Sequence, residues 1–260
     1  LPELDFQSAE RWHLWAESMK LAYADKKAFL GDTDFTDVPL DQLCSSIYAD
    51  DRANLIKADD VITVASAGSP KRDSDGNTTA IVVSDKEGNM IAITKSLNWY
   101  FGSAVTVPDY GFVLNNHMRS FSYEKQSPNL MSASKRPISS MSPVLVFHND
   151  NPYMAISSPG ASKIIAAVSQ VISNVIDYEF DIKTAVNLPR AVNYQGSKLY
   201  AERRIPESVQ DDLTALGHKV SISSMEFNSS YGGVQAIVID KNGLMHGTSD
   251  PRRGGQAIAY

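Results

Sequence analysis

Thr78 is the residue of this sequence whose type and setting could make it a nucleophile. A threonine hydroxyl attacks poorly unless a base lies beside it, but the first residue of a chain carries its own base, the α-amino group. The unperturbed pKa of that amine, about 7.7–8, leaves a useful fraction unprotonated near neutral pH. Thr78 follows a polar stretch, Ser66–Asn77, whose Gly, Ser, Asp and Pro residues are typical of a linker. A cut between Asn77 and Thr78 would create such a terminus; otherwise the stretch is an ordinary loop-to-strand junction.

Two clusters of small hydroxyl residues could serve the same chemistry. Ser157–Ser162 lies between a predicted strand and a predicted helix, where backbone N–H groups and the helix dipole favour an anion. This stretch is either an oxyanion or phosphate cradle or a turn that needs small residues. Ser139 and Ser140, between two prolines, could hydrogen-bond a carboxylate or could simply lead into a strand. Acyl transfer would use these groups, so we expect no metal and no cofactor.

Other chemistries are less well supported by the residue patterns. Asp73–Asn77 resembles the start of a calcium loop, but Val82 and Val83 stand where further ligands would be needed, so we interpret it as a solvated turn. A Ser-His-Asp triad lacks a nucleophile-elbow motif near any of the five histidines. We expect structural or surface roles for four of them and keep one candidate, His117, in the polar cluster Asn115–His117. The four are His13, His148, His218 and His246.

Composition and charge set limits on the class of protein. The 260 residues are 43% hydrophobic and 21% charged, which is typical of one globular domain, and the net charge of −6 argues against nucleic-acid binding. No run of about 18 apolar residues predicts a membrane span. The single cysteine, Cys44, excludes an internal disulfide. The sequence begins LPELDF, with neither Met nor a signal peptide, so we expect a piece of a longer or processed protein, whose compartment it does not fix.

The elements that must position these residues follow from periodicity. Ser8–Leu30 is predicted to be a helix capped by Ser8 and ended by Gly31, followed by short helices and loops over residues 36–64. Two further helices and seven strands are expected; the first two strands form a hairpin. The helices are Ser162–Val175 and Glu207–Leu216, and the strands are Thr78–Asp85, Met90–Lys95, Gly111–Leu114, Val144–Phe147, Tyr153–Ile156, Val234–Asp240 and Leu244–Gly247. This order predicts an α+β fold with helices layered on a mainly antiparallel sheet.

Seven motifs, taken in order, resemble the gamma-glutamyltranspeptidase family of N-terminal-nucleophile hydrolases. They are AYADKKAFLGD (22–32), NTTAIVVSDKEGN (77–89), SLNWYFGS (96–103), GFVLNNHM (111–118), KRPISSMSP (135–143), SSPGASKII (157–165) and SDPRRGGQA (249–257). The resemblance implies an αββα sandwich made from a precursor that cleaves itself into a heterodimer. Residues 1–77 would be the end of the large subunit and residues 78–260 the small subunit, both within one folded domain. The rest of the large subunit, including an arginine that binds the substrate carboxylate, would lie upstream.

The resemblance also implies roles for individual residues. Thr78 would be the nucleophile, forming an acyl-enzyme whose acyl group passes to water or an amine. Ser96 stands where the family usually has a supporting Thr. The remaining matches are Thr79 beside the nucleophile, Gly160 and Ala161 as the oxyanion hole, Ser139 and Ser140 on the substrate α-carboxylate, and Asn98 on its α-amino group.

Departures from the family pattern point to an acylase-like variant. His117 replaces a usual Gln, and Ser120 replaces the Asp that grips the substrate ammonium. Losing that carboxylate removes a charge-assisted hydrogen bond, worth about 1.5–3 kcal/mol. The segment between Ser122 and Lys135 is also too short for the family's lid loop, as in the lidless cephalosporin (glutaryl) acylases and capsule-depolymerase-like enzymes. The resemblance thus implies a γ-glutamyl or glutaryl-like acyl donor, and the sequence does not choose between the two. Two alternatives stay open: an unprocessed, non-catalytic relative acting as a binding module, and a phosphate-binding protein using Ser157–Ser162.

Overall fold

The computed structural model describes residues 1–65 and 77–260, so most of the predicted linker and its calcium-loop alternative lie outside the described residues. The chain divides into two compact units. The first combines residues 1–72, 117–139 and 191–226, and the second combines residues 73–116, 140–190 and 227–260. No helix among the described residues is long and apolar enough to cross a membrane. The predicted α+β class is confirmed.

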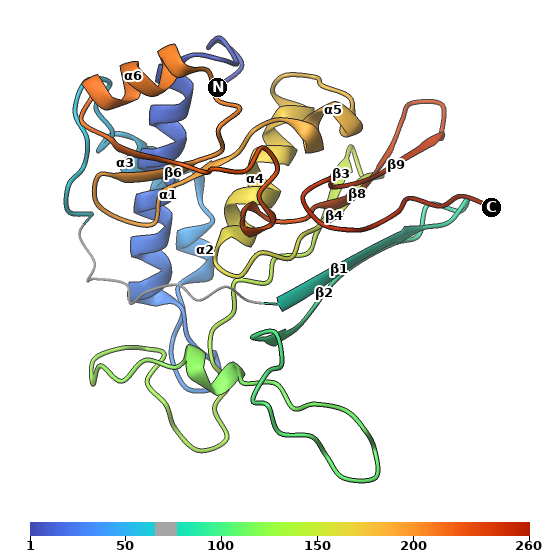
Figure 1. Ribbon diagram of the computed structural model, residues 1–260. Coiled ribbons are helices and arrows are strands. Elements are labelled where there is room, and N and C mark those ends of the chain that lie inside the picture. Colours follow the sequence, from blue (N-terminus) through green and yellow to red (C-terminus); the bar gives the residue numbers. More distant parts are fainter. Residues whose placement is uncertain (66–76) are drawn as a thin grey trace. The chain divides into compact units, whose positions relative to one another are not determined.

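The second unit is built in layers (Figure 1). The hairpin of β1 (Asn77–Ser84) and β2 (Met90–Asn98) packs against a four-stranded antiparallel sheet of order β3-β4-β8-β9. Helices α4 and α5 cover the other face of that sheet, and their buried aliphatic side chains share one core with β4 and β8. The bounds are β3 Val144–His148, β4 Asn151–Ser157, β8 Gln235–Ile239, β9 Met245–Ser249, α4 Lys163–Ile176 and α5 Ile182–Asn187, and a short 3₁₀ turn, η2, spans Ser229–Tyr231.

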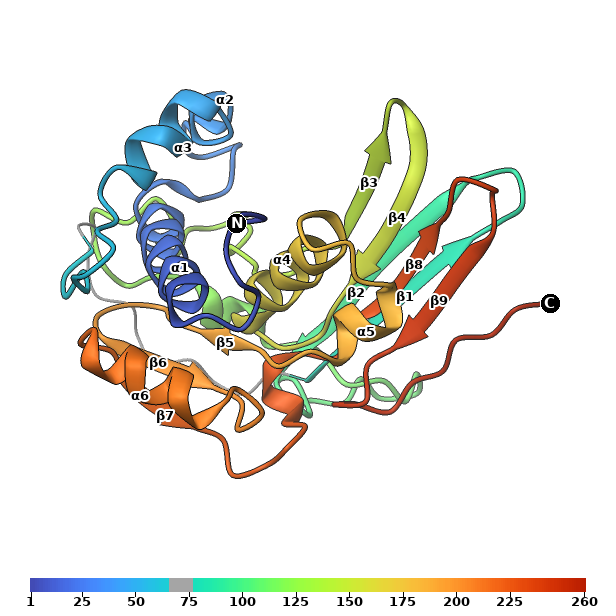
Figure 2. The same cartoon turned by 90° about the horizontal axis from the view of Figure 1, so that it is seen from above.

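The first unit is centred on a long helix, α1 (Ala9–Phe29), whose N-cap Ser8 accepts a hydrogen bond from the Arg11 N–H at 3.1 Å. Helix α6 and a small three-stranded sheet, β5-β6-β7, pack beside α1 around a core that includes Trp12 and Leu213 (Figure 2). The other elements are α2 Leu40–Leu43, α3 Ser46–Ala53, η1 His117–Ser120, β5 Ala191–Val192, β6 Lys198–Ala201, α6 Glu207–Ala215 and β7 Lys219–Ile222.

The predicted elements agree with the structure except in three places. Residues 111–114 form no strand; Val113 makes only an isolated bridge to Thr106. Helix α5 and the β5-β6-β7 sheet were not predicted, because their segments are too short to show a periodic pattern. Gly31 follows the helix without capping it. A side chain there would collide with the Pro128 carbonyl, so close backbone approach explains this glycine.

A buried group of titratable residues ties α1 to the rest of the first unit. Lys20 and Glu17 form a fully buried ion pair, and both also bond the backbone of Ile62. His13 Nε2 lies 2.7 Å from the Lys57 carbonyl, and His13 Nδ1 lies 2.8 Å from His218 Nε2. His218 Nδ1 is buried and has no hydrogen-bond partner among the described residues. A proton on His218 Nδ1 would therefore be a buried donor without an acceptor, which disfavours the charged form of His218.

This cluster predicts that the protein loses stability in mild acid. Burial, then the charges of Lys20 and His13, lower the pKa of His218 from 6.5 to about 4. The unfolded chain binds a proton at His218 near pH 6.5, whereas the folded chain resists it until about pH 4. We expect the free energy of unfolding to fall by up to about 3 kcal/mol as the pH drops through this window.

Urea unfolding measured from pH 7 to pH 4 checks this expectation. His218→Gln should flatten the pH dependence, while His246→Gln, which changes a half-exposed histidine bonded to Asp240, should leave it unchanged. The same slope in His218→Gln and in the unaltered protein would contradict the assignment.

Candidate active site

The hydroxyl of Thr78 is held at an irregular point of the β1–β2 hairpin. Asn77 pairs with Asn98, but Thr78 pairs with Ser96, so Leu97 is an extra residue opposite the Asn77–Thr78 peptide bond. Such a bulge bends the strand and redirects side chains, and bulges are frequent beside active sites. Thr78, only 8% exposed, donates from Oγ1 to Ser96 Oγ at 3.0 Å. The regular register therefore places the two hydroxyls opposite each other, and the bulge lies beside them, at the peptide bond predicted to be cut.

Asn98 stabilises the irregular strand end. Its backbone N–H donates to Ser96 Oγ at 2.8 Å, and its own φ of 73° lies in the left-handed region that asparagine tolerates. Its amide donates to the Asn116 carbonyl at 3.3 Å. Thr79 lies on the opposite face of β1, exposed, across from Lys95. Asn98 thus lies at the Thr78–Ser96 pair, whereas a catalytic role for Thr79 stays a prediction.

A second pair of hydroxyls connects the hairpin to β4. Thr94, two residues before Ser96 on the same face of β2, lies 2.7 Å from the buried Ser157 through their Oγ atoms. Ser157 Oγ also donates to the Ile93 carbonyl at 3.0 Å. Because Ser157 ends β4, this contact fixes the start of the turn that contains Gly160.

The turn over residues 158–161 presents backbone N–H groups before α4. Gly160 has φ 139°, and a side chain there would lie 3.1 Å from the Gly232 Cα, so glycine is required. Ala161 has φ 53°, a left-handed conformation that an alanine adopts at a cost of about 1–2 kcal/mol. Neither N–H donates a hydrogen bond to any of the described residues. The pair can therefore donate to an oxyanion even with alanine at the second position.

Residues near the C-terminal end of the sequence support both parts of the site. Ser158 Oγ accepts from the Gly233 N–H at 3.1 Å, which fixes the Gly160 turn against residues 232–233. Arg253 donates from Nη1 to the Thr78 carbonyl at 3.3 Å and from Nε to the Ser229 carbonyl at 3.0 Å. The Thr78 end of β1 and the 158–161 turn are thus connected through the same segment.

Asp250 anchors that segment. Its carboxylate lies 2.7 Å from Arg190 and 3.1 Å from Arg252, all three side chains being buried, and accepts from the Val234 N–H at 2.9 Å. Burial alone would raise the pKa of Asp250, but the two guanidinium groups and the backbone N–H donors hold it below its ordinary value. Asp250 therefore stays ionised and keeps residues 250–253 in place.

Three predicted substrate-binding residues, His117, Ser120 and Ser139, belong to the first unit, whereas Ser140 belongs to the second. Asn129, 4% exposed, connects the first set: its amide donates to the Ser120 carbonyl at 2.7 Å and accepts from the Ile138 N–H at 3.0 Å. Their proximity to Thr78 stays a prediction.

An ion pair joins two of the family-like motifs within the first unit. The buried carboxylate of Asp32 accepts from the Arg136 backbone N–H and from its guanidinium. These hydrogen bonds hold the pKa of Asp32 far below its ordinary range. The pair therefore fixes the stretch that leads to Ser139.

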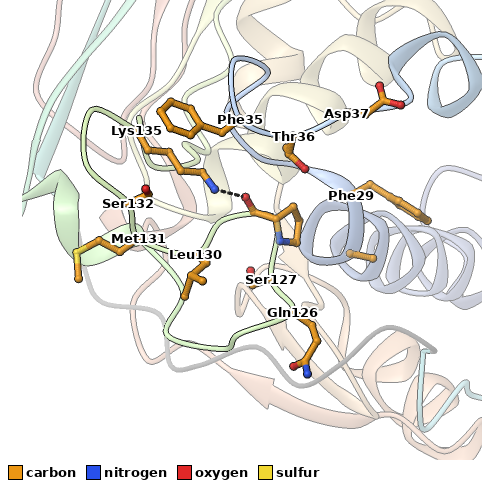
Figure 3. Close-up of a pocket in the computed structure, with 12 residues that line it drawn as sticks. Phe29, Phe35, Thr36, Asp37, Gln126, Ser127, Leu130, Met131, Ser132 and Lys135 are labelled. Carbon is orange, nitrogen blue, oxygen red and sulfur yellow. Dashed lines mark hydrogen bonds between the residues drawn. The ribbon is translucent and has the colours of Figure 1, made fainter.

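Two other features could bind a ligand. An open hollow of about 560 Å³ in the first unit is lined by none of the predicted site residues, and its Lys135 ammonium donates to the Pro128 carbonyl at 2.6 Å (Figure 3). The donor atoms of His13, Glu17 and His218 lie within 4.8 Å of one another, as in a metal site. The Lys20 ammonium already occupies the carboxylate of Glu17 at 2.5 Å, so we assign no metal to this cluster.

The layered arrangement of helices and antiparallel strands is the fold of the N-terminal-nucleophile hydrolases, and comparisons with known proteins agree. The chain belongs to the gamma-glutamyltranspeptidase family, whose model, "Gamma-glutamyltranspeptidase", matches residues 1–260. It is 35% identical to the glutathione hydrolase proenzyme of Bacillus subtilis (strain 168) over 99% of this chain and 46% of that relative. The chain thus spans about half the length of the curated relatives it matches.

Two solved structures are similar to the chain. A cephalosporin acylase from Bacillus halodurans matches with a TM-score of 0.87 and 26% identity, over 99% of this chain and 47% of that one. A gamma-glutamyltranspeptidase from Pseudomonas nitroreducens complexed with L-DON matches with a TM-score of 0.64 and 29% identity, over 70% of this chain and 99% of that one. These similarities confirm the predicted family and its fold.

The sequence did not indicate several residues that position the site. Asn129 lies in an unremarkable loop, and the Thr94–Ser157 contact joins residues 63 positions apart. Arg253 was noted only as part of a family-like motif. The contacts that these residues make carry no local signal, because they form only after folding.

Proposed function

We propose that the protein to which this chain belongs is an amidohydrolase or acyltransferase that cleaves itself before Thr78. The observation that carries the proposal is the Thr78–Ser96 hydroxyl pair at the bulge opposite the Asn77–Thr78 bond. The name "proenzyme" of the Bacillus subtilis relative supports processing. The match to the Pseudomonas nitroreducens chain also supports processing. It covers nearly all of that chain but only 70% of this one, about 182 residues, and the segment from Thr78 to Tyr260 has 183 residues.

The proposed mechanism uses groups that belong to the second unit. After cleavage, the free α-amine of Thr78 takes the proton as Oγ1 attacks the acyl carbonyl carbon. The N–H groups of Gly160 and Ala161 stabilise the resulting oxyanion. The tetrahedral intermediate collapses, the leaving amine takes the proton, and an ester on Oγ1 remains. Water or an acceptor amine then attacks this ester and regenerates the hydroxyl.

Replacement of the nucleophile tests this proposal. Thr78→Ala should abolish both cleavage and turnover of γ-glutamyl and glutaryl anilides, because it removes the attacking oxygen. Ser84→Ala, which removes a hydroxyl at the other end of β1, should leave both intact. Intact-mass measurement and an anilide assay of the full-length protein provide the readouts. An active Thr78→Ala variant, or an active protein without a break before Thr78, would refute the mechanism.

We further propose that the acyl pocket favours a glutaryl group over a γ-glutamyl group. Ser120 offers a hydroxyl where a carboxylate would pair with the substrate ammonium, and a cephalosporin acylase is among the structural neighbours that cover almost the whole chain. The lack of that charge-assisted bond should cost about 1.5–3 kcal/mol, or roughly 10- to 150-fold in affinity for the ammonium.

A substrate panel measures this preference. The ratio of kcat/KM for glutaryl over γ-glutamyl anilide should exceed one and should fall at least tenfold in Ser120→Asp. Ser127→Asp, an acidic substitution in the same unit, is the control for a general charge effect. A strong γ-glutamyl preference in the unaltered protein would contradict the proposal.

The part of the protein outside this chain is proposed to cover the outer face of the hairpin. Ile81 pairs with Ile93 and Val83 with Ile91, and all four side chains are 44–54% exposed. Contiguous apolar patches of this kind mark interaction surfaces. We infer that the remaining half, the large-subunit region, lies on this face.

Hydrogen exchange tests that arrangement. The amides of β1 and β2 should exchange at least tenfold more slowly in the full-length protein than in the isolated 260-residue chain. Asp substitutions at Ile81 and Ile93 should raise the exchange of the β1 and β2 amides in the full-length protein toward that of the isolated chain, whereas Val64→Asp, at an exposed position outside the hairpin, should not. Equal exchange in the two proteins would rule out this interface.

A further inference from the structure

Arg253 is held in place at both ends. Its backbone N–H donates to the Asp250 carbonyl at 3.3 Å, and Asp250 is itself anchored by two buried arginines. The aliphatic part of the Arg253 side chain lies against Gly233. A Cβ added at Gly233 would come within 2.8–3.0 Å of three carbon atoms of Arg253. The Gly233 position therefore has to be small for the guanidinium to reach Thr78.

Two hydrogen bonds of the guanidinium have targets that differ in kind. Nε donates to the Ser229 carbonyl at 3.0 Å, which fixes the group within its own surroundings. Nη1 donates at 3.3 Å to the carbonyl of Thr78, the residue proposed as the nucleophile. Only the planar fork of an arginine provides two such directed donors from one side chain.

From this geometry we propose that Arg253 is a positioning residue for Thr78, which holds the carbonyl of the nucleophile and keeps its α-amino group as the free base near neutral pH. The proposal rests on the proposed function, because the amine exists only after cleavage. Within one residue, the nitrogen and the carbonyl oxygen are separated by three covalent bonds, so the guanidinium lies roughly 6 Å from the amine. A cation at that distance disfavours the ammonium form.

The other charged groups around Thr78 leave this role to Arg253. Strands β4 and β8, which pack against β1, contain no acidic or basic residue, and the titratable side chain there is the phenol of Tyr153. On β2, Lys95 is exposed and lies across from Thr79 on the other face. Arg252 shares the carboxylate of Asp250 with Arg190 and donates to the carbonyls of Val186 and Leu188. In a half-exposed setting, the charge of Arg253 should lower the pKa of the amine by about one unit, a tenfold change in free base at low pH.

The test compares a variant that loses the charge with one that keeps it, in the full-length protein. Arg253→Gln and Arg253→Lys should both slow cleavage before Thr78, since neither can bond the Thr78 and Ser229 carbonyls together. Only Arg253→Gln should move the acidic limb of the kcat/KM profile upward by about one pH unit. Activity at pH 6 should therefore fall about tenfold more in Arg253→Gln than in Arg253→Lys. Lys86→Gln removes a charge from the exposed far end of the hairpin and should change neither readout.

The outcomes separate this inference from the proposed function. An unaltered protein that is neither cleaved nor active would overturn the proposed function. A cleaved and active enzyme whose Arg253→Gln variant keeps the original acidic limb would overturn the inference alone. If Arg253→Gln cannot be purified in a folded state, the cleavage rate of Arg253→Lys tests whether Arg253 positions Thr78. A rate equal to that of the unaltered protein would refute this positioning role.

Discussion

The hydrogen bond between Thr78 and Ser96 is the contact around which the second unit is organised. The regular pairing of β1 with β2 continues through Thr78 and Ser96, so the two hydroxyls lie opposite each other on one face. The pairing shifts by one residue just beyond them, where Asn77 lies opposite Asn98 and Leu97 is the extra residue. The bulge therefore lies at the Asn77–Thr78 bond, next to the hydroxyl pair, and bulges are frequent beside active sites.

The surrounding contacts keep that irregular point rigid from two directions. On one side, Thr94 and Ser157 connect β2 to the end of β4 and so to the 158–161 turn. On the other side, Ser158 binds the Gly233 N–H, and Arg253 binds the Thr78 carbonyl. Catalysis by prepositioned donors needs such rigidity, because a donor that must be oriented during the reaction loses its advantage. The buried Asp250 ion cluster supplies the anchor for the second connection.

Much of this fold could be predicted from the sequence. The hairpin, α1 with its Ser8 cap, α4 and α6 all follow long periodic patterns and clear turn residues. The β5-β6-β7 sheet could not be predicted, since strands of two to four residues carry no readable alternation and β6 pairs with β7 in parallel across an intervening helix. The strand expected at residues 111–114 was wrong because apolar residues in a loop imitate a short strand.

Of the candidate site, residue types indicated Thr78 and the stretch Ser157–Ser162, and the family resemblance added Ser96 and the pair Gly160 and Ala161, but local sequence could not supply their geometry. The left-handed conformation of Ala161 and the register shift at Leu97 are set by packing and pairing with distant segments. Arg253 shows the same limit, since 175 residues separate it from its partner Thr78. His117, Ser120 and Ser139 belong to the other unit, and their roles rest on the family pattern.

The central claim is that Thr78 becomes a free N-terminal residue that carries the acyl group. The most direct measurement is to trap the intermediate by acid-quenching the full-length protein during turnover of a glutaryl anilide, then to locate the added mass by peptide sequencing in a mass spectrometer. The account predicts a glutaryl ester on the side chain of a peptide that begins at Thr78. An acyl group on another side chain, or Thr78 recovered only within a peptide that still contains Asn77, would contradict it.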